Sequence, residues 1–487
     1  MPLRIVDGDI HLHDVKMRMP FKYGIATMTQ APQAYVRLRL EIDGALATGI
    51  AADFLPPKWF TKDPQRPIDD EIDEMLRGIE QALRLAVGLR GETAFDLWRT
   101  LYEAQDAWGR STGLPPLLTH FGTSLVERCA IEAVCRQAGK PFAEMLRSQR
   151  LGLRLGEWHP ELAAARLEEL LPAAPRQSII ARHTVGLLDP LTDGEIAPAE
   201  RLDDGLPQSL AACIEAYGLR HFKFKLCGQV AADIDRLRRI AAVVAEHGPR
   251  GFAFTADGNE QFRSFDAFRQ WWTALLDCAE LRDFWPHLLF VEQPFHRDVA
   301  LDEGELAPLR AWTDRPPLII DESDSAPDSL PRALALGYRG ASHKNCKGVF
   351  RGAINACVIA RLRAEQPSRP LILSGEDLAN IGPVALLADL AVAATLGIES
   401  VERNGHHFVA GLSMFPETVR RQMLDAHGDL YRRSRDGWPT LDVRDGRLAL
   451  SSVLAAPLGV WPEIDVSQFT PLEAWKRNRR SPRETLP

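Results

Sequence analysis

The start of the chain alternates between apolar and charged residues. In AYVRLRLEI every second side chain is apolar and the residues between them are mostly charged, the period of a strand with one buried face. Asp43 and Gly44 follow and predict a hairpin turn. Helical patterns extend over about residues 69–108 and 122–148. Strands followed by helices, without alternation, predict a small α+β domain over residues 1–150.

The hydrophobic pattern changes near residue 177, where short apolar runs begin to alternate with helical patterns. The eight predicted strands begin near residues 178, 221, 251, 288, 317, 340, 370 and 398. Eight repeated βα units predict an α/β fold, a (β/α)8 barrel of the TIM type over residues 177–410. An open doubly wound sheet is the alternative, but no GxGxxG opens a helix.

The last part of the chain does not continue this alternation. TLDVRDGRLALS resembles a hairpin rather than a ninth βα unit. We therefore expect residues 414–487 to return to the N-terminal domain and to complete a capping domain.

Composition is that of an ordinary globular protein, with 45% hydrophobic and 25% charged residues. The formal net charge of −8 has both signs interspersed and no basic tract, which argues against a nucleic-acid partner. Seven scattered cysteines without CxxC pairs favour free thiols in a reducing compartment. Without a signal-peptide pattern or an apolar run of spanning length, we expect a cytoplasmic protein that does not enter a membrane.

Charged residues mark the ends of the second to sixth predicted barrel strands. They are Lys225, Asp257, Glu292, Asp321 and Lys344, each about one βα unit after the last. The C-terminal ends of barrel strands meet at one mouth, where such enzymes do their chemistry. A single acidic residue at a strand end also suits a helix cap, but three in consecutive units favour a shared site.

Three carboxylates in one place would repel unless a cation neutralised them. Oxygen ligands without cysteine or histidine favour Mg²⁺. A lysine beside such an ion would have its pKa lowered and could take the α-proton of a carboxylate substrate. Lys225 and Lys344 would then face each other across the barrel. Lys223 shares the face of Lys225 and could hold the substrate carboxylate or lower the pKa of Lys225.

Other interpretations of these lysines remain open. KFK also suits a solvated edge strand, and a Schiff-base aldolase would use a barrel lysine without needing the carboxylates. Two bases on opposite faces would permit inversion of the α-carbon. One base beside a cation would suit elimination or cycloisomerisation instead.

The motifs KFK, TADGN, VEQP, IIDES and HKNCKG, in this order, resemble those of the enolase superfamily. The match is to its muconate-lactonizing-enzyme-like subgroup, within the mandelate racemase/muconate lactonizing enzyme family. The resemblance implies that Asp257, Glu292 and Asp321 bind Mg²⁺ and that Lys225 and Lys344 are the acid/base pair. Strand seven lacks the histidine of a mandelate-racemase-type site.

The resemblance also implies further contacts around the site. By resemblance, Asn259 lies beside the first metal ligand, and two cap segments, residues 21–30 and 51–60, close over the substrate. Lys223, from its strand face, and Glu376, which departs from the family pattern near the mouth, are with Asn259 the expected substrate-binding residues. The sequence leaves the roles of several charged residues near the strand ends open. These are Arg182, His183, Asp377, Arg403, His406 and His407.

Together these features predict a Mg²⁺-dependent enzyme that removes the α-proton of a small carboxylate substrate to give a metal-stabilised enediolate. A racemase or epimerase is favoured, which would make the protein an isomerase. The alternatives are a dehydratase, a lyase activity, or a cycloisomerase with the same site, and a non-catalytic metabolite-binding barrel. Barrels of this kind often associate, so we expect a homo-oligomer.

Overall fold

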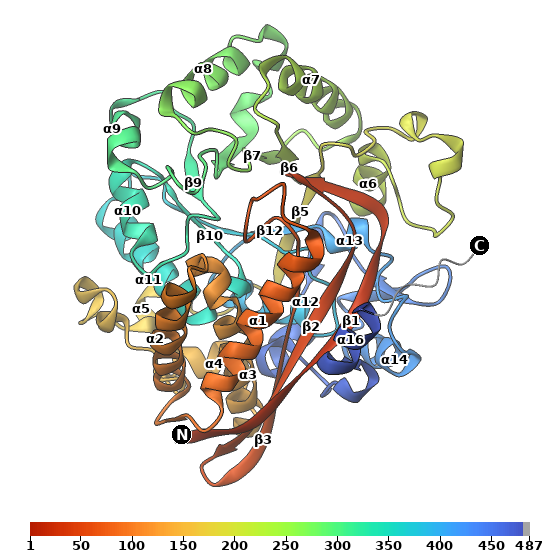
Figure 1. The fold of residues 1–487 in the computed structure, drawn as a ribbon. Coiled ribbons are helices and arrows are strands. Elements are labelled where there is room, and N and C mark those ends of the chain that lie inside the picture. Colours follow the sequence, from red (N-terminus) through yellow and green to blue (C-terminus); the bar gives the residue numbers. More distant parts are fainter. Residues whose placement is uncertain (481–487) are drawn as a thin grey trace.

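A parallel barrel lies at the centre of the computed structural model, which describes residues 1–480 (Figure 1). Its strands pair in chain order, all parallel, and the last strand pairs with the first. The strands are β5 (Ser178–Val185), β6 (His221–Lys225), β7 (Ala253–Asp257), β8 (Leu288–Glu292), β9 (Leu318–Ile320), β10 (Gly340–His343), β11 (Ile372–Gly375) and β12 (Ser400–Arg403). This closure confirms the predicted (β/α)8 barrel and excludes an open sheet.

Helices surround the barrel because each strand is followed by an amphipathic or apolar helical segment. They are α6 (Leu210–Tyr217), α7 (Val230–His247), α8 (Phe265–Leu276), α9 (Glu303–Ala311), α10 (Ser329–Leu336), α11 (Val349–Glu365) and α12 (Ala385–Thr395). A short α5 (Leu167–Leu170) precedes the first strand. The chain thus has the mixed α/β architecture expected from its apolar pattern.

Strand β6 shows why the KFK alternation arises. Phe222 and Phe224 are fully buried and stack on each other, and the ring of Phe224 also contacts those of Phe254 in β7 and Phe284. Lys223 and Lys225 lie on the opposite face of the strand, inside the barrel, with 1% and 7% of their surfaces exposed. The strand is therefore central rather than a solvated edge, and its lysines need partners in the interior.

The N-terminal domain is an antiparallel sheet covered by helices. Its strands are β1 (Leu3–Tyr23), β2 (Ala26–Ile42), β3 (Ala45–Phe54) and the short β4 (Arg90–Gly91). Its helices are α1 (Ile68–Ala86), α2 (Ala94–Thr112), α3 (Pro116–Ala138) and α4 (Phe142–Arg147). Asp43 and Gly44, both with positive φ, form the predicted turn between β2 and β3.

Each of the two long helical segments expected in this domain is two helices. The first is interrupted at Gly88, whose φ of 88° lies in the left-handed region, and by β4, which pairs with β1. The second is interrupted at Gly139, with a φ of 61°, and Pro141 follows. Both breaks contain a left-handed glycine, which is the usual signal for the end of a helix, and the predicted segments passed over it.

The C-terminal segment contacts both the barrel and the N-terminal sheet. Its elements are α13 (Gly405–Phe408), α14 (Glu417–Ala426), β13 (Tyr431–Arg433), β14 (Pro439–Leu441), β15 (Arg447–Ala449), α15 (Ser451–Ala455), β16 (Thr470–Pro471) and α16 (Leu472–Arg480). Strand β16 pairs with β1 of the N-terminal sheet. The expected hairpin over TLDVRDGRLALS is present only as one antiparallel bridge, between Arg444 and Arg447 across the turn at Asp445 and Gly446. The strands on either side have other partners, because β14 pairs with β13 and β15 pairs with barrel strand β5.

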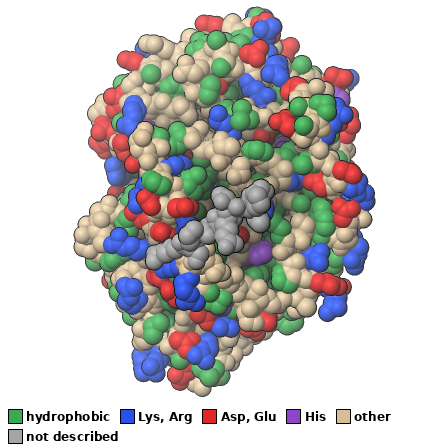
Figure 2. Space-filling model, turned by 45° about the vertical axis from the view of Figure 1, so that its right-hand side comes forward, with side chains coloured by type: hydrophobic (Ala, Val, Ile, Leu, Met, Phe, Trp, Pro, Cys, Tyr) green, Lys and Arg blue, Asp and Glu red, His purple; other side chains and the backbone are tan. Residues whose placement is uncertain are grey.

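Three further features bear on the sequence interpretation. All seven cysteines are unpaired thiols. Across the part of the chain that the structure describes, every helix is too short or too polar to cross a bilayer. On the face drawn in Figure 2, acidic and basic side chains are interspersed.

Candidate active site

A pocket of about 430 Å³, open solvent included, lies at the C-terminal mouth of the barrel. Barrel residues and residues of the N-terminal domain line it together. The barrel contributes Lys223, Lys225, Asp257, Asn259, Asp321, Glu322, Lys344, Asp377, Leu378, Ala379, Glu402 and Asn404. The N-terminal domain contributes Phe21, Tyr23, Met28, Pro56 and Trp59. Both segments expected to cover the mouth thus supply part of its wall.

Lys225 and Lys344 reach this pocket from different sides of the barrel. Lys225 is the last residue of β6 and Lys344 follows β10, four strands away in the closed order. Lys225 Nζ lies 2.5 Å from Asp257 Oδ2, and Lys344 Nζ lies 2.7 Å from Asp321 Oδ2. The two ammonium groups therefore line one pocket, each bound to its own carboxylate.

The Asp321 carboxylate controls the protonation of Lys344. Burial, the largest single effect, lowers the pKa of Lys344, but Asp321, Glu292 and Glu322 together raise it above the ordinary lysine value, with Asp321 contributing most. Lys347 also binds this carboxylate, with its Nζ 2.9 Å from Oδ1. Lys344 can act as a neutral base near pH 7 only when another cation binds the Asp321 carboxylate in its place.

Lys223 lies deeper, among four carboxylates. Its Nζ donates hydrogen bonds of 3.0 Å to Glu376 Oε2 and to Glu402 Oε2. The same nitrogen is 3.0 Å from Asp257 Oδ2 and 2.7 Å from Glu292 Oε2. Burial lowers the pKa of Lys223, yet these carboxylates raise it well above its usual value. Lys223 is therefore a permanent positive charge inside the barrel.

The three predicted metal ligands are all buried near these lysines. Asp257 and Asp321 line the pocket, whereas Glu292 lies beneath it beside Lys223. Their oxygens do not form one tight group. In residues 1–480 one group of three His, Cys, Asp or Glu residues has ligand atoms that all lie within 4.8 Å of one another. That group lies elsewhere, in the barrel wall, and includes none of these three residues.

The chemistry of the donors nevertheless suits a hard divalent ion. Asn259 Oδ1 is a buried oxygen without a hydrogen-bond donor, and the only partner of Glu292 Oε2 in the described residues is the Lys223 ammonium, 2.7 Å away. Burial and the neighbouring Glu376 raise the pKa of Glu292 well above its ordinary value, so a cation is needed to keep it ionised. All of these donors are oxygens, the type that Mg²⁺ prefers. The residues fit Mg²⁺, provided that it replaces lysine ammonium groups beside the carboxylates.

The remaining predicted residues separate into two sets. Asn259 and Asp377 line the pocket. Glu376 does not, because it is hydrogen-bonded to Lys223 and paired with Arg182 inside the barrel. Arg403 also lies inside the barrel, with its Nη2 3.3 Å from Asp377 Oδ2.

The predicted site residues do not include Glu402, Glu322 or Lys347, three further acidic or basic residues of the site. Glu402 lines the pocket and accepts a hydrogen bond from Lys223. It precedes the last residue of β12, so the same strand-end rule that selected Asp257 and Glu292 could have found it. Lys347 binds Asp321 from a 3-10 turn after β10. No periodic pattern predicts that turn, so the contact between Lys347 and Asp321 could be found only in the structure.

The class of protein that this fold defines is a (β/α)8 barrel joined to an α+β capping domain. Searches with the sequence found no matching family model and no matching curated protein. Among solved structures, muconate lactonizing enzyme from Pseudomonas fluorescens, complexed with muconolactone, is 16% identical, with a TM-score of 0.59 over 96% of this chain and 98% of that one.

Two other similar structures carry magnesium. An enolase from Bradyrhizobium, complexed with magnesium and mandelic acid, is 17% identical, with a TM-score of 0.58 over 94% of this chain and 96% of that one. Dipeptide epimerase from Enterococcus faecalis, complexed with Mg and L-Leu-L-Tyr, is 15% identical, with a TM-score of 0.56 over 94% and 99%. The chain therefore has the fold of enolase-superfamily proteins, as the sequence resemblance predicted.

Proposed function

We propose that this protein is a Mg²⁺-dependent enzyme of the enolase superfamily that moves the proton α to the carboxylate of a small molecule. A racemase or epimerase is the form we favour. One observation carries the proposal: Lys225 and Lys344 line a single pocket from strands on opposite sides of the barrel. The magnesium and carboxylate ligands of the similar structures agree with it.

The two lysines divide the reaction between them. The neutral amine of one takes the α-proton from one face of the substrate. The ammonium of the other then gives a proton to the opposite face, which inverts the α-carbon. The segments around Tyr23 and Trp59 exclude water from the reacting groups.

A metal ion would complete the charge balance. Asp257, Glu292 and Asp321 would hold Mg²⁺, which when bound stabilises the negative charge that develops on the substrate carboxylate. Lys223 would remain beneath the site as a fixed charge shared with Glu376 and Glu402.

The wall of the pocket suggests the kind of substrate. Above the lysines it consists of apolar and aromatic side chains from the N-terminal domain, with Leu378 of the barrel loop beside them. The ring of Trp59 lies over Lys344, with the ammonium 4.5 Å from its centroid. We therefore propose a carboxylate with an apolar or aromatic substituent, because such a group would replace water against this wall.

The experiment is a deuterium-exchange screen of carboxylates with apolar and polar substituents. The protein is incubated in D₂O with Mg²⁺, and mass and chirality are read for each compound. We expect a gain of one deuteron with inversion, lost in EDTA and restored by Mg²⁺. Exchange that survives EDTA contradicts the metal requirement, and an unsaturated or cyclised product would identify the dehydratase or cycloisomerase instead. A complete lack of exchange would favour the non-catalytic barrel.

A further inference from the structure

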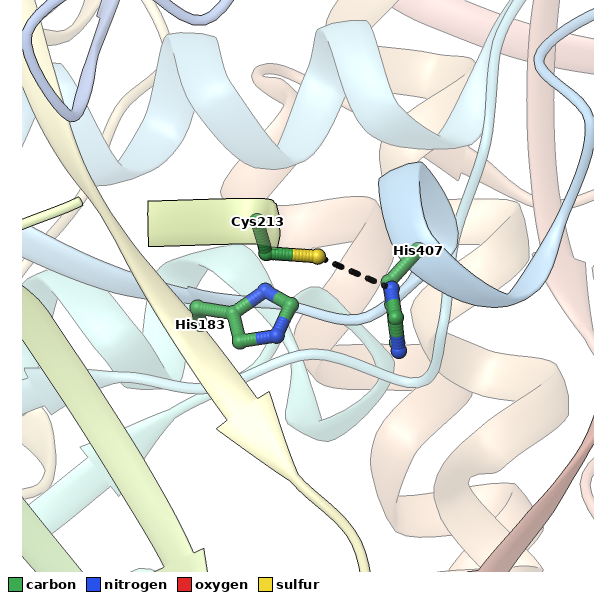
Figure 3. A group of neighbouring side chains, drawn as sticks. All are labelled: His183, Cys213 and His407. Atoms are coloured by element: carbon green, nitrogen blue, oxygen red, sulfur yellow. Dashed lines mark hydrogen bonds between the residues drawn. The ribbon is translucent and has the colours of Figure 1, made fainter. Parts of the chain in front are cut away.

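A second group of metal-binding side chains lies in the barrel wall, with no residue in common with the pocket. It consists of His183 in β5, Cys213 in α6 and His407 in α13, and all three are buried. Their potential ligand atoms lie within 4.8 Å of one another. Figure 3 shows the three side chains converging from three separate elements.

One spacing within this group, between Cys213 and His407, matches the edge of a zinc coordination tetrahedron. Cys213 Sγ lies 3.5 Å from His407 Nδ1. With ordinary zinc–sulfur and zinc–nitrogen bond lengths, a tetrahedral edge between these atom types is about 3.6 Å. The rings of His183 and His407 are 4.8 Å apart between centroids and steeply inclined at 71°. They are therefore not stacked, and both can present a nitrogen to one point beside the thiol.

The second nitrogen of each histidine faces a polar group, although only that of His183 lies within hydrogen-bond distance of it. His183 Nδ1 lies 3.1 Å from His406 Nε2, which leaves His183 Nε2 for an ion. His407 Nε2 faces Asp189, 4.0 Å from its Oδ2. Metal-binding histidines are usually held in this way, by a carboxylate or another acceptor behind the ring.

We propose that His183, Cys213 and His407 bind one Zn²⁺ ion at this position. Binding replaces the thiol proton of Cys213, which leaves to solvent, and forms Zn–S and two Zn–N bonds. The thiolate and the Asp189 carboxylate balance the two charges of the ion, so the buried site is neutral overall. The fourth coordination position takes water.

The position gives the ion a structural role. His183 of β5 is in register with Arg403 of β12, the pairing that closes the barrel, and His407 follows four residues later. Cys213 belongs to α6, the helix that follows β5. The ion therefore joins the first strand, the first barrel helix and the segment after the last strand at the seam of the barrel.

The test uses the untagged full-length chain, produced in medium with Zn²⁺ or with Co²⁺ in its place, and purified in excess Mg²⁺ to fill the carboxylate site. We expect about one equivalent of Zn²⁺ by elemental mass spectrometry. The cobalt form should show a thiolate-to-cobalt charge-transfer band, which an oxygen-only site cannot give. Chelation of the metal should lower the melting temperature.

Cys213→Ser should lose the charge-transfer band and bind at least tenfold less metal, whereas Cys278→Ser, a half-buried cysteine outside the group, should behave as wild type. His407→Gln provides a second variant if Cys213→Ser does not fold. A wild-type protein without stoichiometric metal or without the band overturns the proposal, since the group is then only a hydrogen-bonded thiol and imidazoles. Equal metal binding by wild type and Cys213→Ser also overturns it. Both results are independent of deuterium exchange at the pocket.

Discussion

At the scale of single residues, the ammonium of Lys223 compensates several buried acids at once. Four carboxylates lie within 3.0 Å of its Nζ, and 1% of the residue is exposed. Buried charges are tolerated only when they are paired, because desolvation costs more than a single contact returns. The first lysine of KFK is thus required by the acids around it, whatever it also does for the substrate.

Replacing Lys223 with Met should lower the free energy of unfolding by about 3–5 kcal/mol, because carboxylates would be left buried without their cation. Mg²⁺ should restore part of this loss by supplying another charge. Denaturant unfolding with and without Mg²⁺ measures both effects. Lys140→Met, at an exposed ion pair, should change stability by less than about 1 kcal/mol. An equally small effect at Lys223 would contradict the charge balance described above.

Glu127 connects the two halves of the molecule through one hydrogen bond. It belongs to α3, and its Oε1 accepts a 2.6 Å bond from Phe350 N in α11 of the barrel. Burial raises the pKa of Glu127 to about 7, from an ordinary value of 4.5. Below about pH 4.5 both the folded and the unfolded states hold this proton. As the pH rises through 7, the folded state also loses this proton, and the stability that the protonated form contributed is lost.

The stability of the wild type should therefore fall by up to about 3 kcal/mol between pH 4.5 and 8 on account of Glu127. Glu127→Gln keeps the acceptor oxygen but does not titrate. Its melting temperature should therefore rise relative to that of the wild type as the pH increases. Thermal scans at pH 5 and pH 8, at one scan rate, measure this. Glu144→Gln, at an exposed position of α4, is the matched control and should follow the wild type. Parallel curves for Glu127→Gln and the wild type would refute the assignment.

At the scale of elements, close backbone contact fixes how the cap helix α3 lies on β3. A Cβ added to Gly49 would stand 1.9 Å from Cys129 O and 3.0 Å from Ala133 Cβ. Only glycine fits there, because the opposing atoms include helix backbone that cannot move alone. The small residue in GALATG thus sets the distance between sheet and helix.

Gly49→Ala should destabilise the protein by about 1–3 kcal/mol, because the strand and the helix must separate. Gly251→Ala is the matched control, since no heavy atom lies within 4 Å of the added Cβ. The midpoints of denaturant unfolding give the comparison. If both substitutions have the same effect, the close contact at Gly49 does not limit the packing.

Periodicity predicted the elements better than it predicted their ends and partners. The eight barrel strands were predictable because each apolar run is short and is followed by a helical pattern. The breaks between α1 and α2 and between α3 and α4 were missed, although Gly88 and Gly139 mark them. The partners of β14 and β15 were also missed, because strand pairing between distant segments leaves no local pattern.

At the scale of the whole molecule, the pocket exists only where the cap and the barrel meet. Trp59 comes from the segment after β3 and is 6% exposed, with its ring over Lys344. Asn380, in the loop after β11, donates to Asp53 of β3 at 2.7 Å and accepts from Phe54 N at 3.2 Å. The cap is therefore anchored to the barrel beside the proposed site.

Trp59→Ala should raise KM for an apolar substrate roughly tenfold, because the ring covers the pocket and contacts the ammonium of Lys344. The lysines themselves stay in place, so kcat should fall less than KM rises. Steady-state kinetics on the substrate found by the exchange screen would separate the two. Trp461→Ala removes an exposed tryptophan and serves as control. An unchanged KM would show that Trp59 does not contact the substrate.

The sequence was informative about the site where residues recur once per βα unit. Lys225, Asp257 and Glu292 end their strands, and Asp321 and Lys344 directly follow theirs. Their mutual contacts could not be predicted, because the partner of a buried charge depends on side-chain geometry. Lys347 on Asp321, and Arg182 on Glu376, are examples. The His183, Cys213 and His407 group was equally hidden, since its members lie far apart along the chain.

The central claim is that Lys225 and Lys344 transfer protons at opposite faces of one α-carbon, and the most direct measurement is exchange from each enantiomer separately. Lys225→Ala and Lys344→Ala are incubated with each enantiomer of the substrate in D₂O and Mg²⁺, with Lys140→Ala as the exposed control. Each variant should lose exchange from one enantiomer by at least about 10²-fold, a different one for each lysine. Wild-type exchange of both enantiomers in either variant would contradict the account.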